Sequence, residues 1–264
     1  MMPTIAHYLA QQPVFNPTGL LPFYFGSNQL GWVEPEIASI LCSQTQDWKI
    51  NQQTLYLDSL QPEQAMHTAA KMLQQQGLIQ GWRNEQYGVY APNSNSAADF
   101  TQPLLALERA AFRRFGLLSR AVHINGYYPD GSLCIARRAK TKSIDPDRLD
   151  NMAAGGIPHG EDPRDCAIRE LFEEAGFKSQ FSTALVLQET ILMQRNEIDG
   201  THRELLYCFD LALPADFIPH NQDGEVAAFY RMSPAQAIND LSQMTWDAGV
   251  VTARFLQRQQ FQCL

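Results

Sequence analysis

The sequence predicts an α+β fold in which a mixed β-sheet is sandwiched between helices and preceded by a smaller α+β domain. Strand-like and helix-like stretches alternate along all 264 residues, and hairpin signals among them exclude a purely parallel sheet. Residues 92–99 are small and polar, as in a linker. We therefore predict one domain over residues 1–100 and a second over residues 101–264.

Turn residues and apolar spacing mark the elements of the first predicted domain. Its long amphipathic helix places Ala65, Ala69, Met72 and Leu73 at core spacing and ends at Gly77. The expected elements, in order, are strands over 21–26 and 28–33, a helix from Pro35, a strand over 54–60, the helix over 62–79 and a strand over 86–92.

The second predicted domain mixes hairpins with helices. A Pro-Asp-Gly turn at residues 129–131 joins two of its strands as a hairpin. The expected elements, in order, are a basic amphipathic helix over 104–118, strands over 121–128 and 133–139, a central helix, strands over 182–193, 203–213 and 225–232, and helices starting near Pro234 and Asp247.

Bulk composition excludes several classes of protein. A net charge of −8 and a pI near 5.2 argue against a general binder of nucleic acid or membrane surfaces. No apolar run reaches the roughly 18 residues that span a bilayer, and no secretory signal is visible at the N-terminus. The five cysteines are scattered without a CxxC pair, which favours the cytoplasm and argues against a disulfide framework and a zinc site.

Residues 155–177 carry most of the functional information. Glu170, Glu173 and Glu174 stand at i, i+3 and i+4, so they share one face of a helix. Like charges at that spacing repel unless a cation neutralises them. Asp162 and Pro163 fit the start of this helix, and Gly176 fits its end. Apolar side chains occupy the adjoining arc of about 140°; they are Ala167, Ile168, Leu171, Phe172 and Ala175.

The whole stretch is identified as the Nudix box. Its pattern is Gly, five residues, Glu, seven residues, Arg-Glu-aliphatic, any residue, Glu-Glu, any residue and Gly followed by an aliphatic or aromatic residue. It falls without departure on Gly155, Glu161, Arg169, Glu170, Leu171, Glu173, Glu174, Gly176 and Phe177. Seven letters are fixed, each about one in twenty by composition, so a chance match is on the order of one in a billion per start position.

Carboxylates in this arrangement suit Mg²⁺, with Mn²⁺ as the alternative. We assign Glu173 and Glu174 as metal ligands, and Glu170 as a third ligand or the general base. Gly155 is assigned to the predicted metal site because a glycine lets the backbone approach the site closely. Arg169 could form an ion pair with Glu173 and so orient the carboxylates. The alternative is an ordinary surface ion pair, which contributes about 0.5 kcal/mol or less and has the same sequence spacing.

Residues outside the box complete the predicted site. Glu225 is the first candidate for a further catalytic carboxylate, before Glu189 and Glu204, although each could be a plain surface glutamate. A basic cluster before the box could hold substrate phosphates, or could be a solvated loop. It contains Arg137, Arg138, Lys140 and Lys142, of which Arg137 and Lys142 are assigned to the substrate.

Two further features are interpreted as structural. His123 and Asn125 share one face of a strand, where a satisfied core histidine is the better interpretation. Cys166 lies near the carboxylate face and is interpreted as packing.

The segments around the box resemble a two-domain Nudix family related to thiamine pyrophosphokinase. The resemblance covers residues 21–41, 121–160 and 203–232, with Cys134 where an aromatic residue is usual. It implies a Mg²⁺-dependent pyrophosphatase that converts thiamine diphosphate or its oxidised forms to the monophosphate. It also implies that the N-terminal domain helps to select the leaving group, for which stacking of Trp32 on a cationic ring is one possibility beside core packing.

Other functions stay open from sequence. The same chemistry could act on ADP-ribose, a nucleotide sugar, coenzyme A or a nucleoside triphosphate, because the box recognises phosphates rather than the leaving group. A non-catalytic ligand-binding module and a diphosphate isomerase are alternatives of another class. The expected partner is a small-molecule diphosphate, with no nucleic acid or membrane, and a homodimer is conceivable.

Overall fold

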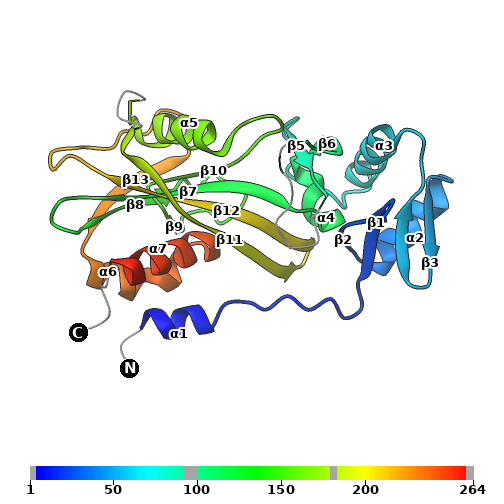
Figure 1. Cartoon of the computed structure of the whole chain (residues 1–264), viewed down its shortest axis with the longest axis horizontal. Coiled ribbons are helices and arrows are strands. Elements are labelled where there is room, and N and C mark those ends of the chain that lie inside the picture. The colour runs from blue at the N-terminus through cyan, green and yellow to red at the C-terminus, as the bar shows by residue number, and fades with distance from the viewer. Residues whose placement is uncertain (1–3, 92–99, 101, 179–182, 260–264) are drawn as a thin grey trace.

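The computed structural model describes residues 4–91, 100, 102–178 and 183–259 (Figure 1). The predicted linker, 92–99, lies outside the described residues. No helix within these ranges is both long enough and apolar enough to cross a bilayer.

The N-terminal part contains a four-stranded sheet in the order β2-β1-β4-β3, next to helices α2 and α3 (Figure 1). β1 and β4 pair in parallel, and the other two pairs are antiparallel. The elements are α1 (Ile5–Ala10), β1 (Leu21–Phe25), β2 (Asn28–Val33), α2 (Pro35–Gln44), β3 (Trp48–Asn51), β4 (Thr54–Leu57) and α3 (Pro62–Gln75). The strands and helices predicted here are confirmed, and β3 is an addition with one buried residue, Trp48.

A two-stranded sheet of β5 (Gln86–Val89) and β6 (Leu105–Glu108) connects the two parts of the molecule. The prediction of a helix over 104–118 is wrong for its first half. Leu105 and Leu107 are buried in alternation and pair with β5, so tertiary pairing outweighs helix propensity. A 3₁₀ turn, Arg109–Ala111, and the short helix α4, Phe112–Phe115, then end at Gly116 with φ 60°.

The larger sheet is mixed, with the strand order β11-β12-β7-β8-β13. β7 pairs in parallel with β12, β10 pairs antiparallel with β7, and β9 pairs antiparallel with β8. Its elements are β7 (Ser119–Tyr127), β8 (Leu133–Arg138), β9 (Leu149–Asp150), β10 (Ala153–Gly156), α5 (Pro163–Ala175), β11 (Leu185–Glu197), β12 (Gly200–Ala212), β13 (Val226–Met232), α6 (Pro234–Asp240), a 3₁₀ turn (Leu241–Gln243) and α7 (Trp246–Arg258). The predicted hairpin, strands and final helices are confirmed.

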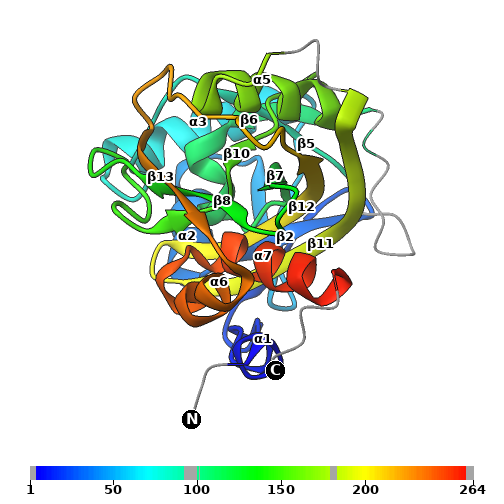
Figure 2. The ribbon, with the colours of Figure 1, turned by 90° about the vertical axis from the view of Figure 1, so that its left-hand side faces the viewer.

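Helices cover both faces of this sheet. Figures 1 and 2 show α5 on one face and α6 and α7 on the other, which gives the expected α/β/α layers. One apolar cluster fills the α5 side, and a second joins the sheet to α6 and α7. α1 packs on α7 through Tyr8, whose ring stacks on Trp246. A third cluster draws on residues 21 to 117, so β6 and α4 pack with the N-terminal sheet.

Candidate active site on helix α5

Local signals fix the ends of α5. The Asp162 side chain accepts a hydrogen bond from Arg164 N at 2.8 Å, and Pro163 takes the first helical position. Gly176 ends the helix in the left-handed region at φ 66°. Leu171 and Ala175 face the core as predicted, but Phe172 is 53% exposed.

Arg169 is the centre of an ion-pair network on α5. Its guanidinium donates two hydrogen bonds to Glu161, at 2.9 and 2.8 Å. Nη1 also donates to Glu170 at 2.7 Å and to Glu173 at 3.0 Å. Arg169 lowers the pKa of the Glu161 carboxyl. One arginine therefore fixes three carboxylates, which is more than a simple i,i+4 surface pair would do.

Glu170 and Glu174 are buried, whereas the Glu173 side chain is 40% exposed. Glu174 Oε2 accepts a hydrogen bond from Ala154 N at 2.8 Å, and its Oε1 lies 4.0 Å from Lys142 Nζ. Burial raises the pKa of Glu170, and burial followed by the charge of Glu170 raises the pKa of Glu174 to about 8. Both shifts mean that an additional cation would favour the ionised carboxylates.

Gly155 makes room for this cluster. A Cβ atom at Gly155 would lie 2.1 Å from the carboxyl carbon of Glu170, so glycine lets the Glu170 carboxylate lie directly against β10. The oxygen donors and the space at Gly155 fit a hard dication. Mg²⁺ is usually bound through one or two carboxylates together with water and substrate phosphates, and does not need a cage of protein ligands.

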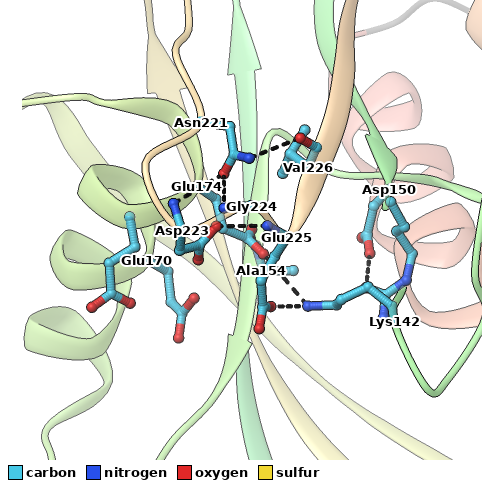
Figure 3. Close-up of polar contacts among 12 residues, drawn as sticks. Lys142, Asp150, Ala154, Glu170, Glu174, Asn221, Asp223, Gly224, Glu225 and Val226 are labelled. Atoms are coloured by element: carbon cyan, nitrogen blue, oxygen red, sulfur yellow. Dashed lines mark hydrogen bonds and ion pairs between the residues drawn. The ribbon is translucent and has the colours of Figure 1, made fainter. Parts of the chain in front are cut away.

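Glu225 approaches the carboxylates of α5 from a loop before β13 (Figure 3). Asn221 shapes the loop: its Oδ1 accepts from Gly224 N at 3.2 Å and its Nδ2 donates to Val226 O at 2.8 Å. Glu225 forms an ion pair with Lys142, whose pKa is lowered by burial. Asp223 lies in the same loop and was not predicted from sequence.

Most of these side chains, but not Glu174 or Asn221, line a cavity of about 210 Å³. Its acidic side chains are Glu85, Glu170, Glu173, Asp223 and Glu225, and its basic side chains are Arg83, Arg109, Arg138, Lys142 and Arg169. A second cavity, of about 710 Å³, shares the wall formed by Ala154, Gly155 and Gly156 and also shares Arg83, Arg109 and Arg138. The two cavities therefore adjoin at β10.

The N-terminal part forms one wall of both cavities. Glu108 is fully buried, and its carboxylate accepts hydrogen bonds from Arg83 N at 3.0 Å and Glu85 N at 3.1 Å. This anchor fixes the loop that carries Arg83, whose guanidinium donates to Ser143 Oγ at 3.3 Å.

The strand after this loop closes the contact with the box. His159 N donates to Gln86 O at 2.8 Å, and the Tyr87 hydroxyl packs so closely on Gly156 that a Cβ there would lie 1.5 Å from it. Sequence reasoning missed Arg83, Arg109 and Tyr87 as site residues, because no local motif links them to the box.

The remaining candidates are divided between this site and other regions. Arg138 lines the cavities but is held by Asp150 at 2.7 Å, and Arg137 contacts Tyr230 and Asp147 outside both cavities. The Lys140 side chain is 81% exposed. Glu189 pairs with Arg254 and Arg258, away from α5.

Four more side chains from the sequence analysis do not line the smaller cavity. His123 Nδ1 bonds to Asn151 Oδ1 at 2.8 Å, and Asn125 Oδ1 accepts from Asn151 Nδ2 at 3.0 Å, as expected of core residues. Trp32 packs on Phe15 and lines neither cavity. Cys166 is buried in the core under α5.

Comparisons with known proteins match both parts of the chain. A family model described as the NUDIX domain matches residues 118–255, and one described as a domain of unknown function, DUF4743, matches residues 5–119. Nudix hydrolase 24, chloroplastic, from Arabidopsis thaliana is 38% identical over 184 residues, or 67% of this chain and 49% of that protein. Nudix hydrolase 20, chloroplastic, from the same plant is 35% identical over 217 residues, or 79% and 56%. This chain thus spans about half the length of these curated relatives.

Among solved structures, that of DR0079 from Deinococcus radiodurans is 18% identical, with a TM-score of 0.44, and covers 64% of this chain and 98% of that one.

Proposed function

Because this chain belongs to the Nudix hydrolase family, we propose that it hydrolyses a diphosphate linkage in a small molecule with the help of a divalent cation. The observation that carries this proposal is the meeting of Glu170 and Glu173 of α5 with Lys142 and Arg83 around one cavity. Hydrolysis of a diphosphate requires neutralised phosphoryl oxygens and an activated water, and this cavity offers groups for both.

The α5 carboxylates are the proposed metal ligands. Glu173 and Glu174 would bind Mg²⁺ or Mn²⁺, and Glu170, held against Gly155, is either a third ligand or the general base. The cation would neutralise charge on the substrate phosphates. Arg169 keeps Glu170 and Glu173 in place through its two hydrogen bonds.

Lys142 and Arg83 are the proposed phosphate-binding residues. Lys142 lies between Glu174 and Glu225, so its charge is held inside the cavity rather than in solvent. Arg83 brings a second cation from the N-terminal part and borders both cavities. Glu225 is the carboxylate outside the box that can help to activate water, and its ion pair with Lys142 fixes its position.

The leaving group would occupy the 710 Å³ cavity, whose volume lies within the range of small-molecule sites. This cavity borders the N-terminal part, which supports a role for that part in substrate selection. Together with the family resemblance, it supports thiamine diphosphate or its oxidised forms as the first candidate substrates. ADP-ribose and nucleotide sugars are the alternatives, because the phosphate-binding groups do not distinguish the leaving group.

A substrate screen tests this proposal. Purified protein with Mg²⁺ is incubated with thiamine diphosphate, its oxo and oxy derivatives, ADP-ribose, nucleotide sugars and coenzyme A, and the products are identified by mass. Release of thiamine monophosphates with the highest kcat/KM supports the full proposal. Preference for a nucleotide retains the chemistry and rejects the substrate, whereas no cleavage of any compound rejects hydrolysis in favour of a binding module.

Glu174→Gln tests the metal site. Gln keeps the volume and can still accept a hydrogen bond from Ala154 N, but it removes a charged ligand. We expect kcat to fall about 1000-fold, since a bound metal contributes several kcal/mol to the transition state. The matched control is Glu36→Gln, an exposed position in α2, which should keep wild-type turnover. Full activity of Glu174→Gln at saturating Mg²⁺ would exclude Glu174 as a ligand.

The cytoplasmic location, the homodimer and the absence of nucleic-acid or membrane partners stay predictions from sequence.

A further inference from the structure

Three side chains of types that bind metals converge in the lining of the 710 Å³ cavity. They are His202 and Glu204 on β12 and Asp247 in the first turn of α7. His202 Nε2 lies 3.4 Å from Asp247 Oδ2 and 4.0 Å from Glu204 Oε2. Among the described residues, this is the one group of three such side chains whose ligand atoms all lie within 4.8 Å of one another.

The His202 ring is buried without a hydrogen bond at this point. Its side chain is 8% exposed, and its Nε2 atom has no hydrogen-bond partner among the described residues. When Nε2 carries no proton, it turns a lone pair toward two carboxylates, which is a repulsive arrangement in a buried site. A cation placed between the three side chains would turn this repulsion into coordination.

Each carboxylate has one oxygen engaged and the other directed to His202. Asp247 Oδ1 accepts a hydrogen bond from Arg195 Nη1 at 2.9 Å, and Glu204 Oε1 accepts from Ser119 Oγ at 2.8 Å. Asp247 Oδ2 and Glu204 Oε2 are the oxygens nearest the imidazole. The engaged oxygens hold the carboxylates in orientation, as neighbouring groups do for metal ligands.

The local charge leaves room for a dication. Asp247, Glu204 and Glu197 bring three carboxylates to this region, whereas Arg195 is the guanidinium that pairs directly with Asp247 and Glu197. The Arg195 side chain is 7% exposed and the Asp247 side chain 14% exposed, so solvent neutralises little of this charge. Arg109, which pairs with Glu85, also attracts Glu204, and a bound dication would balance the carboxylate charge that remains after these two guanidinium groups.

The two separations from His202 fit a single ion. With metal–ligand bonds of about 2.0–2.2 Å, two ligands of one ion can be at most about 4.2 Å apart, and the separations from His202 are 3.4 and 4.0 Å. One imidazole and two carboxylates suit Zn²⁺, whereas Mg²⁺ prefers oxygen ligands alone. The sequence argued against zinc because its cysteines are scattered, but this group contains no thiol.

We propose that His202, Glu204 and Asp247 bind a Zn²⁺ ion, in addition to the dication assigned to the α5 carboxylates. The ion connects β12 to the start of α7 and faces the cavity that receives the leaving group.

The test is a Zn²⁺ titration of the metal-free full-length protein in excess Mg²⁺, which saturates the α5 carboxylates. Calorimetry and metal analysis after desalting give the affinity and the stoichiometry. We expect wild type to bind one Zn²⁺ per chain, and both His202→Gln and Glu204→Gln to bind it more than about tenfold more weakly. The matched control is His67→Gln on α3, which lines neither cavity and should leave zinc binding unchanged.

Two results would overturn the proposal. The first is that wild type takes up no Zn²⁺ in excess Mg²⁺, which would show that His202 and Asp247 interact without a metal ion. The second is zinc uptake that neither substitution weakens. Glu204→Gln keeps the test valid if His202→Gln fails to fold, because the Glu204 side chain lies nearer solvent, at 18% exposed. The readout is binding in saturating Mg²⁺, so it does not depend on whether the protein hydrolyses a diphosphate.

Discussion

At the scale of single residues, the site holds carboxylates where water cannot stabilise them. Glu174 is buried beside Glu170, and both have raised pKa values because burial penalises their charged forms. Lys142 offsets part of this cost at 4.0 Å, but burial also lowers the pKa of Lys142. Ionised carboxylates at these positions destabilise the metal-free protein, and a bound dication would stabilise them.

The metal-free protein should therefore become less stable as pH rises from about 4.5 to about 8. The folded pKa of Glu174, about 8, lies above its ordinary value of 4.5, so the unfolded chain releases this proton first. Below the ordinary value the contribution is fully present, and it is lost as pH rises through the folded pKa. Thermal unfolding in EDTA across this range measures the effect.

Two comparisons isolate the contribution of Glu174. Glu174→Gln has no proton to release at this position, so its stability should fall less with pH than that of wild type. Added Mg²⁺ should raise the unfolding temperature of wild type more at high pH than at low pH. Equal pH slopes for wild type and variant would show that Glu174 does not titrate in this way.

Gly155→Ala should weaken metal binding without unfolding the protein. The new Cβ would lie 2.1 Å from the Glu170 carboxyl carbon, and the flexible end of that side chain can move away. Glu170 would then leave its place beside Arg169. We expect Mg²⁺ affinity to fall about tenfold or more, measured by the Mg²⁺ dependence of turnover, with the unfolding midpoint near wild type as the control. An unchanged Mg²⁺ dependence would exclude this role of Gly155.

At the scale of elements, predictions held where local signals decide the structure. The start and end of α5 follow from Asp162, Pro163 and Gly176, which act within one turn. The segment 104–118 was misassigned because its first half pairs with β5, a strand that is adjacent in space but remote in sequence, and the segment itself carries no local signal of this pairing. Phe172 is exposed although it lies in the apolar arc, since helix periodicity alone does not define how wide the buried face is.

The cap of α5 gives a test at this scale. Asp162→Ala removes the acceptor for Arg164 N, so the free energy of unfolding should fall by about 1 kcal/mol. Asp162→Asn retains an oxygen acceptor and should lose much less. Urea unfolding of the three proteins measures both values, and equal losses for Ala and Asn would show that charge, rather than the hydrogen bond, stabilises the helix start.

At the scale of the whole molecule, the site depends on chain segments that no motif connects. The box supplies the α5 carboxylates, and their helical spacing was visible in the sequence. Arg83 reaches the same cavity because buried Glu108 anchors its loop. His202 and Asp247 meet because α7 packs under β12, a contact between two elements that sequence spacing does not reveal. A long-range meeting of this kind follows from tertiary packing and has no local signature.

Arg83→Gln tests whether the N-terminal part binds substrate. The substitution removes a charge that borders both cavities, whereas the backbone hydrogen bond from residue 83 to Glu108 stays. If Arg83 holds a phosphate equally in the bound substrate and in the transition state, KM should rise about tenfold with little change in kcat. Lys71→Gln on α3, a cation that contacts Trp82 and lines neither cavity, should keep wild-type kinetics. A fall in kcat at constant KM would instead show that Arg83 stabilises the transition state more than the bound substrate. Wild-type kinetics of Arg83→Gln would exclude a role of Arg83, and with it of the N-terminal part, in phosphate binding.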